Sequence, residues 1–110
     1  MNIQIFGKNK CFDTKKAERW FKERRIRFQS VDLKKYGMSM GELTSVKQAV
    51  GLENLVDPGH PDAVLWSYLA SDQAKLEKLY EEPALLRTPI VRNGKQATVG
   101  YCPQVWETWT

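Results

Sequence analysis

A cysteine near the start of the chain has the sequence surroundings of a reactive thiol. Cys11 lies between a short alternating run, Ile3–Phe6, and a segment with helical spacing that begins at Asp13. Free N–H groups and the positive end of a helix dipole meet at such a position, and both favour the nucleophilic thiolate or a bound oxyanion. Four cations flank the cysteine against one acid: Lys8, Lys10, Lys15 and Lys16. We therefore expect the pKa of Cys11 to lie below the ordinary value for a thiol.

The same pattern allows a plainer interpretation, in which Cys11 is a small buried residue without chemistry. Cysteine is among the most buried residue types, and one cysteine before a helix is a weak motif. We expect His60, which lies in a predicted loop, to be exposed to solvent rather than to serve Cys11 as an acid or base. The run Lys22–Arg25 is typical of a solvated helix face. Core spacing, rather than base stacking, explains the tryptophans: Trp20, Trp66, Trp106 and Trp109.

The composition is that of an ordinary globular domain. The chain has 110 residues, 42% of them hydrophobic and 27% charged, so we expect a single domain over 1–110. Two cysteines and one histidine cannot form a four-ligand metal cage, so no metal site is expected. No apolar run approaches the roughly 20 residues of a membrane span, and no secretory signal is visible, so we expect a cytoplasmic protein without a membrane partner. The net charge of +4 suits an anionic substrate and gives no strong nucleic-acid signal.

Hydrophobic spacing predicts a β-α-β unit at the start of the chain. A strand over Ile3–Phe6 precedes a helix from the N-cap Asp13 to about Arg25, and a second strand follows over Phe28–Leu33. Ser39 and Glu42 form a capping box for the next helix, which Gly51 ends. An irregular segment and two further helices follow, near 62–70 and 72–82.

The last third predicts a β-β-α unit. Two runs, 89–92 and 96–99, flank Asn93-Gly94, which favours a type I′ hairpin turn. Pro103 suits the first turn of a final helix whose buried face carries Val105, Trp106 and Trp109. The fold class is therefore α/β, with a four-stranded mixed sheet and a helical insert, about 39–84, between the βαβ and ββα halves.

Three segments resemble the ArsC/Spx family: Gly7–Ala17, Leu85–Val91 and Val99–Tyr101. The resemblance spans essentially the whole chain and implies a thioredoxin-like fold with Cys11 as its catalytic residue. It also implies that Pro89 follows a cis peptide bond, which would place the backbone of Thr88 beside Cys11. Taken with the residues around the cysteine, it predicts that the substrate-binding set comprises Lys8, Asn9, Lys15, Arg87, Thr88 and Pro89.

The sequence departs from the family at the positions that would bind arsenate. Arsenate reductases of this family surround the cysteine with three arginines, and this chain has Asp57, Thr88 and Tyr101 there, although Arg87 is adjacent. Guanidinium groups bind oxyanions bidentately, and neutral donors are poor substitutes. We therefore expect weak arsenate reduction at best.

Two functions from different classes follow from the resemblance. The first is a thiol-dependent reductase without a bound cofactor, in which glutathione or a redoxin (glutaredoxin or thioredoxin) regenerates Cys11. The alternative is an Spx-like transcriptional regulator that binds RNA polymerase. Spx proteins often carry Cys-x-x-Cys, and Thr14 replaces the second cysteine here. Gly51 is a loose match to a glycine through which Spx binds polymerase, but a helix cap explains it equally.

A second cysteine stands where topology brings it toward the first. Cys102 follows the predicted fourth strand, which ends at the same edge of the sheet as the first strand. It opens a helix, which should ease its ionisation. Cys102 could therefore resolve an oxidised Cys11 by forming a disulfide, or it could be a half-buried residue of the helix start.

Overall fold

A mixed sheet of four strands forms the middle of the computed structural model, which describes residues 1–110. The strands are β1 (Ile3–Gly7), β2 (Phe28–Asp32), β3 (Ile90–Asn93) and β4 (Gln96–Val99), in the order β2-β1-β3-β4. β1 runs parallel to β2 and antiparallel to β3, and β4 runs antiparallel to β3. The predicted mixed sheet is confirmed.

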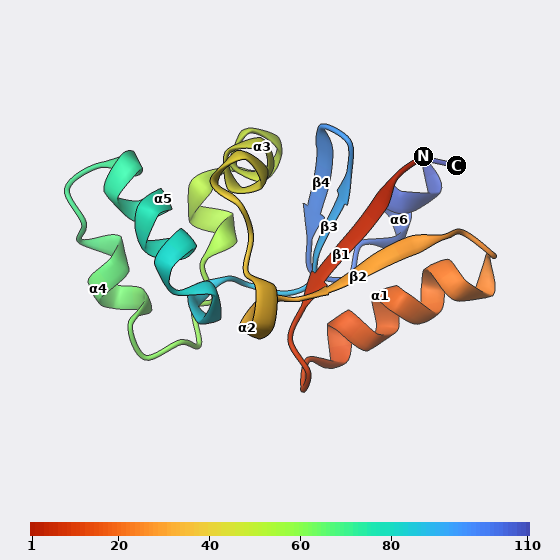
Figure 1. Cartoon of the computed structure of the whole chain (residues 1–110), viewed down its shortest axis with the longest axis horizontal. Coiled ribbons are helices and arrows are strands. Elements are labelled where there is room, and N and C mark those ends of the chain that lie inside the picture. The colour runs from red at the N-terminus through yellow and green to blue at the C-terminus, as the bar shows by residue number, and fades with distance from the viewer.

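Helices cover both faces of this sheet (Figure 1). α1 (Phe12–Glu23) and α6 (Pro103–Glu107) pack on one face, where Ile3 and Ile5 join a buried cluster with Trp106. Phe6 and Ile90 face the opposite side and join a larger cluster with the insert. The insert consists of α2 (Leu33–Tyr36), α3 (Met40–Val50), the 3₁₀ turn η1 (Leu52–Leu55), α4 (Ala63–Ser67), α5 (Asp72–Glu81) and the 3₁₀ turn η2 (Pro83–Leu85).

Backbone pairing ties the irregular segment of the insert to the chain that leads into β3. Val56 forms an isolated antiparallel bridge with Leu86. The N–H of Asp57 donates to the carbonyl of Leu85 at 2.7 Å, and the N–H of Arg87 donates to that of Leu55 at 2.8 Å. The insert is therefore fixed to the sheet just before Thr88.

Several local predictions are confirmed. The capping box of α3 forms in both directions between Ser39 and Glu42, and Gly51 closes the helix with a φ of 89°. The predicted helices of the insert are present as α4 and α5. Trp20, Trp66 and Trp106 are buried, while Trp109 packs against the cluster beneath α1 and α6.

Other boundaries differ from prediction. α1 begins at Phe12, so its N-cap is Cys11 rather than Asp13, which lies in the first turn. The helix ends at Glu23 rather than near Arg25, because the backbone turns into the left-handed region there. The second strand stops at Asp32, whose side chain caps α2, a helix the sequence analysis missed.

The C-terminal unit has two corrections. Asn93 pairs with Gln96, so the two central residues of the hairpin turn are Gly94 and Lys95 rather than Asn93 and Gly94. Only Gly94 of these has a positive φ, which matches a type II′ turn instead of type I′. Val105 does not belong to the buried face of α6: it is exposed, and Trp106 alone fills that core position.

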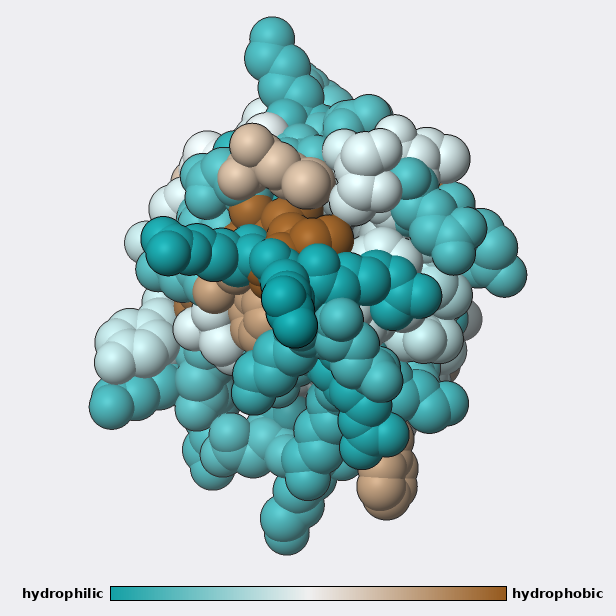
Figure 2. Space-filling model, turned by 90° about the vertical axis from the view of Figure 1, so that its right-hand side faces the viewer, coloured by the Kyte–Doolittle hydropathy of each residue, from teal (hydrophilic) through white to brown (hydrophobic).

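No helix has the length and apolar character needed to cross a membrane. Figure 2 views the end of the molecule where α1 stops, and shows mainly hydrophilic side chains around a small hydrophobic area.

The packing of α1 on β1 predicts a large effect of a small substitution. A Cβ added at Gly7 would lie 2.2 Å from Thr14 Cγ2, so Gly7→Ala should lower the free energy of unfolding by about 1–3 kcal/mol. Denaturant titration measures the loss. Gly41→Ala, whose added Cβ would meet nothing closer than Ser39 Oγ at 3.9 Å, is the matched control and should not destabilise. A Gly7→Ala protein as stable as the parent would contradict the packing described here.

Candidate functional site

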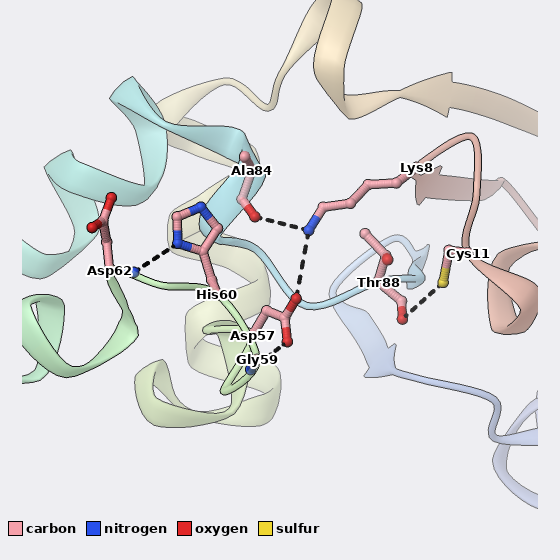
Figure 3. Close-up of polar contacts among 8 residues, drawn as sticks. All are labelled: Lys8, Cys11, Asp57, Gly59, His60, Asp62, Ala84 and Thr88. Carbon is pink, nitrogen blue, oxygen red and sulfur yellow. Dashed lines mark hydrogen bonds and ion pairs between the residues drawn. The ribbon is translucent and has the colours of Figure 1, made fainter.

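Cys11 lies at the end of the loop that connects β1 to α1. A backbone hydrogen bond from Cys11 N to Lys8 O, at 3.2 Å, closes the loop that precedes the helix. Cys11 then adopts extended backbone angles as the N-cap of α1, and its side chain is half-buried. The thiol donates to the carbonyl of Thr88 with a sulfur–oxygen distance of 3.6 Å (Figure 3). The sequence left open whether Cys11 is a reactive thiol or a small buried residue. The sulfur is partly accessible at the start of a helix, which agrees with the first interpretation.

Thr14, in the first turn of α1, is a second polar neighbour of the sulfur. Thr14 is 7% exposed, and its buried Oγ1 has no hydrogen-bond partner among the bonds of ordinary geometry. The absence of a side chain at Gly7 allows Thr14 to pack this deeply. The Thr14 hydroxyl is free to donate toward the sulfur, and this interaction favours the thiolate and lowers the pKa of Cys11.

The pKa of Cys11 is lowered, as predicted, although the cause differs from the one expected. Burial is the largest single effect and opposes ionisation. Hydrogen bonds from the side chains of Thr14 and Thr88, and from the N–H groups of Thr14 and Asp13, together outweigh it and lower the pKa of Cys11. The pKa of Cys11 is therefore lowered by the hydroxyls beside the sulfur and by the free N–H groups of the first turn. The lysine charges are not among the causes.

The chain that precedes β3 supplies the opposite wall of the site. The Thr88–Pro89 peptide bond is cis, as the family resemblance implied, and Pro89 is buried. The carbonyl of Pro89 accepts from the N–H of Gly100 at 2.8 Å, which joins the end of β4 to the same wall. Thr88 therefore presents both its carbonyl and its hydroxyl to Cys11.

Two lysines of the predicted cluster, Lys8 and Lys16, contact residues other than Cys11. Lys8 Nζ donates to the carbonyl of Ala84 at 2.8 Å and lies 3.9 Å from the Asp57 carboxylate, so it reaches toward the insert (Figure 3). Lys16 lies over the ring of Tyr101, 5.5 Å from its centroid. Both cations thus contact other residues.

Asn9 and Lys15 also lie on the side of the loop away from Thr88. Together with Lys8 and Thr14 they line a pocket of about 280 Å³ that faces β2. Cys11 is not part of its lining. The predicted site residues therefore divide into two groups, one toward β2 and one, with Thr88 and Pro89, around the sulfur.

Arg87 and Cys102 lie near each other at the C-terminal side of the site. A Cβ added at Gly100 would be 3.9 Å from Arg87 Nη2. Burial raises the pKa of Cys102 and outweighs the positive charge of Arg87, while Asp13 adds to the rise. The expectation that the start of α6 would ease ionisation of Cys102 is therefore wrong. Its thiol donates to the carbonyl of Val99 at 3.3 Å.

The remaining candidates stay apart from the sulfur. His60 is half-buried rather than fully exposed, and its Nδ1 accepts from the N–H of Asp62 within the insert. Figure 3 shows it beyond Asp57, turned away from Cys11. No group of three or more His, Cys, Asp or Glu side chains converges in a way that could hold a metal ion.

Sequence reasoning missed two neighbours of the thiol. Thr14 entered only as the residue that replaces a second cysteine, yet its spacing carried a signal: the side chain of an N-cap residue meets the backbone of the residue three positions later. Phe12, which precedes the predicted start of the helix at Asp13, begins α1 and is 82% exposed.

Comparison with known proteins gives these features a context. The ArsC family model matches residues 65–109. The Global transcriptional regulator Spx 2 of Oceanobacillus iheyensis is 27% identical over 107 residues, which cover 92% of this chain and 78% of that protein. The arsenate reductase from Vibrio cholerae matches with a TM-score of 0.84, 24% identity and 97% of both chains covered. An ArsC family related protein from Bacteroides fragilis matches over 100% of both chains with a TM-score of 0.86 and 16% identity. The ArsC-like, thioredoxin-like architecture is thereby confirmed.

The hydrogen bond of Thr14 predicts a change in the pH dependence of thiol reactivity. Thr14→Val keeps the shape of the side chain and removes the hydroxyl, so the thiolate loses a donor and the pKa of Cys11 rises. The rate of alkylation by iodoacetamide follows the thiolate fraction, so its midpoint should move to higher pH. Thr14→Ser should keep the parent midpoint, and Thr44→Val, in α3, is the matched control. Superimposable curves for Thr14→Val and the parent would rule out the Thr14 contact.

Proposed function

We propose that this relative of the ArsC and Spx proteins is a thiol-dependent oxidoreductase whose nucleophile is Cys11. The observation that carries the proposal is the lowered pKa of a half-buried Cys11 at the start of α1, with Thr14 and Thr88 donating to the sulfur. A thiolate at this position can attack an electrophile that approaches from the solvent side.

The reaction that fits the donors is exchange with a glutathione mixed disulfide. The Cys11 thiolate attacks the glutathione sulfur, the disulfide breaks, and the other thiol leaves as a thiolate that takes a proton from water. A second glutathione thiolate then attacks the glutathione sulfur on Cys11, which releases glutathione disulfide and restores the Cys11 thiolate. The net reaction consumes one free glutathione: the mixed disulfide and one glutathione thiol become the released thiol and glutathione disulfide. A redoxin dithiol could replace glutathione as the reductant.

The side chains around the sulfur favour a disulfide of a small thiol as the substrate over an oxyanion such as arsenate. The side chains that contact Cys11 are neutral hydroxyls from Thr14 and Thr88. Phe12, the next residue in the chain after Cys11, is exposed and offers an apolar side chain to a substrate. Neutral donors bind an arsenate dianion less well than paired guanidinium groups do.

The three positions that carry arsenate-binding arginines in the family reinforce this view. Asp57 brings a negative charge and pairs with Lys8, while Thr88 and Tyr101 are uncharged. Arg87 is the remaining guanidinium, and it is exposed on the side of Cys102. We propose that arsenate is a poor substrate.

Cys102 is proposed to stay free during turnover. Its pKa is raised by burial and its thiol is bonded to Val99, so it is a weaker nucleophile than glutathione at neutral pH. Glutathione or a redoxin, rather than Cys102, then resolves the mixed disulfide on Cys11.

The second candidate function is a regulator that binds RNA polymerase. The observation in its favour is the relative named Global transcriptional regulator Spx 2, which aligns with 92% of this chain. Thr14 leaves no vicinal cysteine pair with Cys11, so a disulfide switch at that place cannot form. Gly51 has a φ of 89° at the end of α3, so its substitution would disturb the helix end and is a poor probe of polymerase binding.

A coupled assay separates the two candidates. With the mixed disulfide of glutathione and 2-mercaptoethanol, glutathione, glutathione reductase and NADPH, the parent should consume NADPH and Cys11→Ser should fall to background. Cys102→Ser should retain most of the activity, and peptide mapping after mild peroxide should show glutathione on Cys11 with Cys102 free. If the parent is no faster than Cys11→Ser but is retained by purified RNA polymerase, the regulator is the better assignment.

Arsenate turnover gives an independent check. With glutaredoxin and glutathione present, the protein should reduce arsenate far more slowly than the Vibrio cholerae arsenate reductase measured side by side. The reason is that Asp57, Thr88 and Tyr101 offer no guanidinium to the oxyanion. Comparable turnover would show that other groups bind arsenate here.

A further inference from the structure

The positive charge of this protein is concentrated in one short segment. Residues 19–27 hold five of the 17 Lys and Arg residues and one of the 13 Asp and Glu residues. The rest of the chain therefore carries 12 charges of each sign, and the segment accounts for the whole net charge of +4. All five cations are exposed: Arg19, Lys22, Arg24, Arg25 and Arg27.

None of these cations is used in an ion pair. The salt bridges of the protein join Lys8 to Asp57, Lys75 to Glu53 and Lys78 to Glu82, all outside the segment. A cluster of like charges repels itself in the free protein, so an anion brought to it gains more than it would at an isolated lysine.

The Arg24 side chain and the Arg25 backbone are each held in place. Arg24 lies over the ring of Trp20, 4.0 Å from its centroid, and donates to the Trp20 carbonyl at 3.2 Å. Arg25 has a φ of 58° and closes α1 as a Schellman motif, in which Arg25 N donates to Lys22 O and Ile26 N donates to Phe21 O, each at 3.0 Å. The Arg24 side chain, fixed in this way, loses less freedom on binding.

Arg25 is a residue that local backbone preference disfavours. Glycine is the usual residue at the left-handed position of this motif, because a Cβ is strained there. Strain of this kind is found where a side chain has a function that offsets it. The helix end by itself does not call for an arginine at this position, where glycine would be less strained.

The cations surround an apolar centre. Lys22, Arg25 and Arg27 line a groove of about 600 Å³ together with Ile26 and Phe28, whose side chains are half-buried. Figure 2 looks onto this end of the molecule, where hydrophilic side chains enclose a small hydrophobic area. We propose that the end of α1 and the turn after it form a docking surface for an acidic segment of a partner protein that carries an apolar side chain.

The chemistry favours a protein partner over nucleic acid or lipid. Protein interfaces combine an apolar centre with arginine-rich surroundings. Binding of single-stranded nucleic acid uses exposed aromatic rings for stacking, whereas Trp20 is buried and Phe28 is half-buried. Insertion into a membrane surface uses a broad apolar face, and this groove offers two apolar residues.

The surface is separate from the thiol. Cys11 precedes the first turn of α1, whereas the groove begins at its last turn with Lys22 and continues beyond the helix, so the 12 residues of the helix keep the thiol and the groove about 18 Å apart. A partner bound at this end leaves Cys11 accessible, so docking can be tested whatever the reaction of the thiol proves to be.

Fluorescence anisotropy with a labelled peptide of glutamates around one central leucine tests the proposal at low salt. Lys22→Glu/Arg27→Glu should weaken binding about tenfold or more, which corresponds to at least about 1.4 kcal/mol. Lys34→Glu/Lys35→Glu makes the same charge change on α2 and should alter the affinity less than about twofold. Replacing the central leucine by glycine in the peptide should also weaken binding.

Arg25→Gly is a variant that should fold, because glycine adopts the positive φ of this position without strain. Removal of the strained Cβ should raise the midpoint of thermal unfolding, while loss of the guanidinium weakens peptide binding. Equal loss of affinity in both double variants would overturn the proposal, as would a higher Tm for Arg25→Gly with unchanged affinity. Binding to a DNA duplex, or to vesicles of phosphatidylserine and phosphatidylcholine, is measured in the same way. The proposal is overturned in favour of one of these ligands if the protein binds it more tightly than the peptide and if Lys22→Glu/Arg27→Glu abolishes that binding.

Discussion

The contact between Gly7 and Thr14 determines where the reactive sulfur lies. Because Gly7 has no side chain, the methyl and hydroxyl groups of Thr14 occupy the space beside the end of β1, and the first turn of α1 packs directly on the strand. That packing makes Cys11 the N-cap and brings its sulfur to the carbonyl of Thr88. The same packing buries the Thr14 hydroxyl, which can then donate to the Cys11 thiolate. One close approach thus positions the nucleophile and supplies part of its stabilisation.

The insert binds a positive charge of the loop that precedes α1. Lys8 is held by Ala84 and Asp57, and backbone bonds on either side of the Val56–Leu86 bridge fix the insert next to Thr88. The thiolate is consequently stabilised by neutral donors, whose strength does not depend on salt in the way that a lysine field would. This arrangement suits an exchange reaction in which the charge moves between sulfur atoms, and it explains why the family's oxyanion chemistry is not expected here.

The dipole of α1 favours opposite charges at its two ends. A thiolate at its start and a cluster of cations at its end are each favoured by the partial charge of the nearer terminus. The last turn holds Lys22, and Arg24 and Arg25 cap the helix. A single helix of 12 residues therefore stabilises an anion where chemistry occurs and presents an unpaired positive surface at the opposite end.

The sequence by itself determined the features that depend on neighbours along the chain. Alternation at Ile3 and Ile5, the capping box of Ser39 and Glu42, and the cysteine before a helix all act over a few residues, and the resemblance to ArsC and Spx proteins rests on such short blocks. The tertiary structure decided the rest. Whether Cys11 or Asp13 caps α1 depends on how Thr14 meets Gly7, and the direction of Lys8 depends on Asp57 and Ala84. Burial raises the pKa of Cys102, although its place at a helix start suggested the opposite. These outcomes balance desolvation and hydrogen bonds between segments far apart in sequence, and only the folded chain brings those segments into contact.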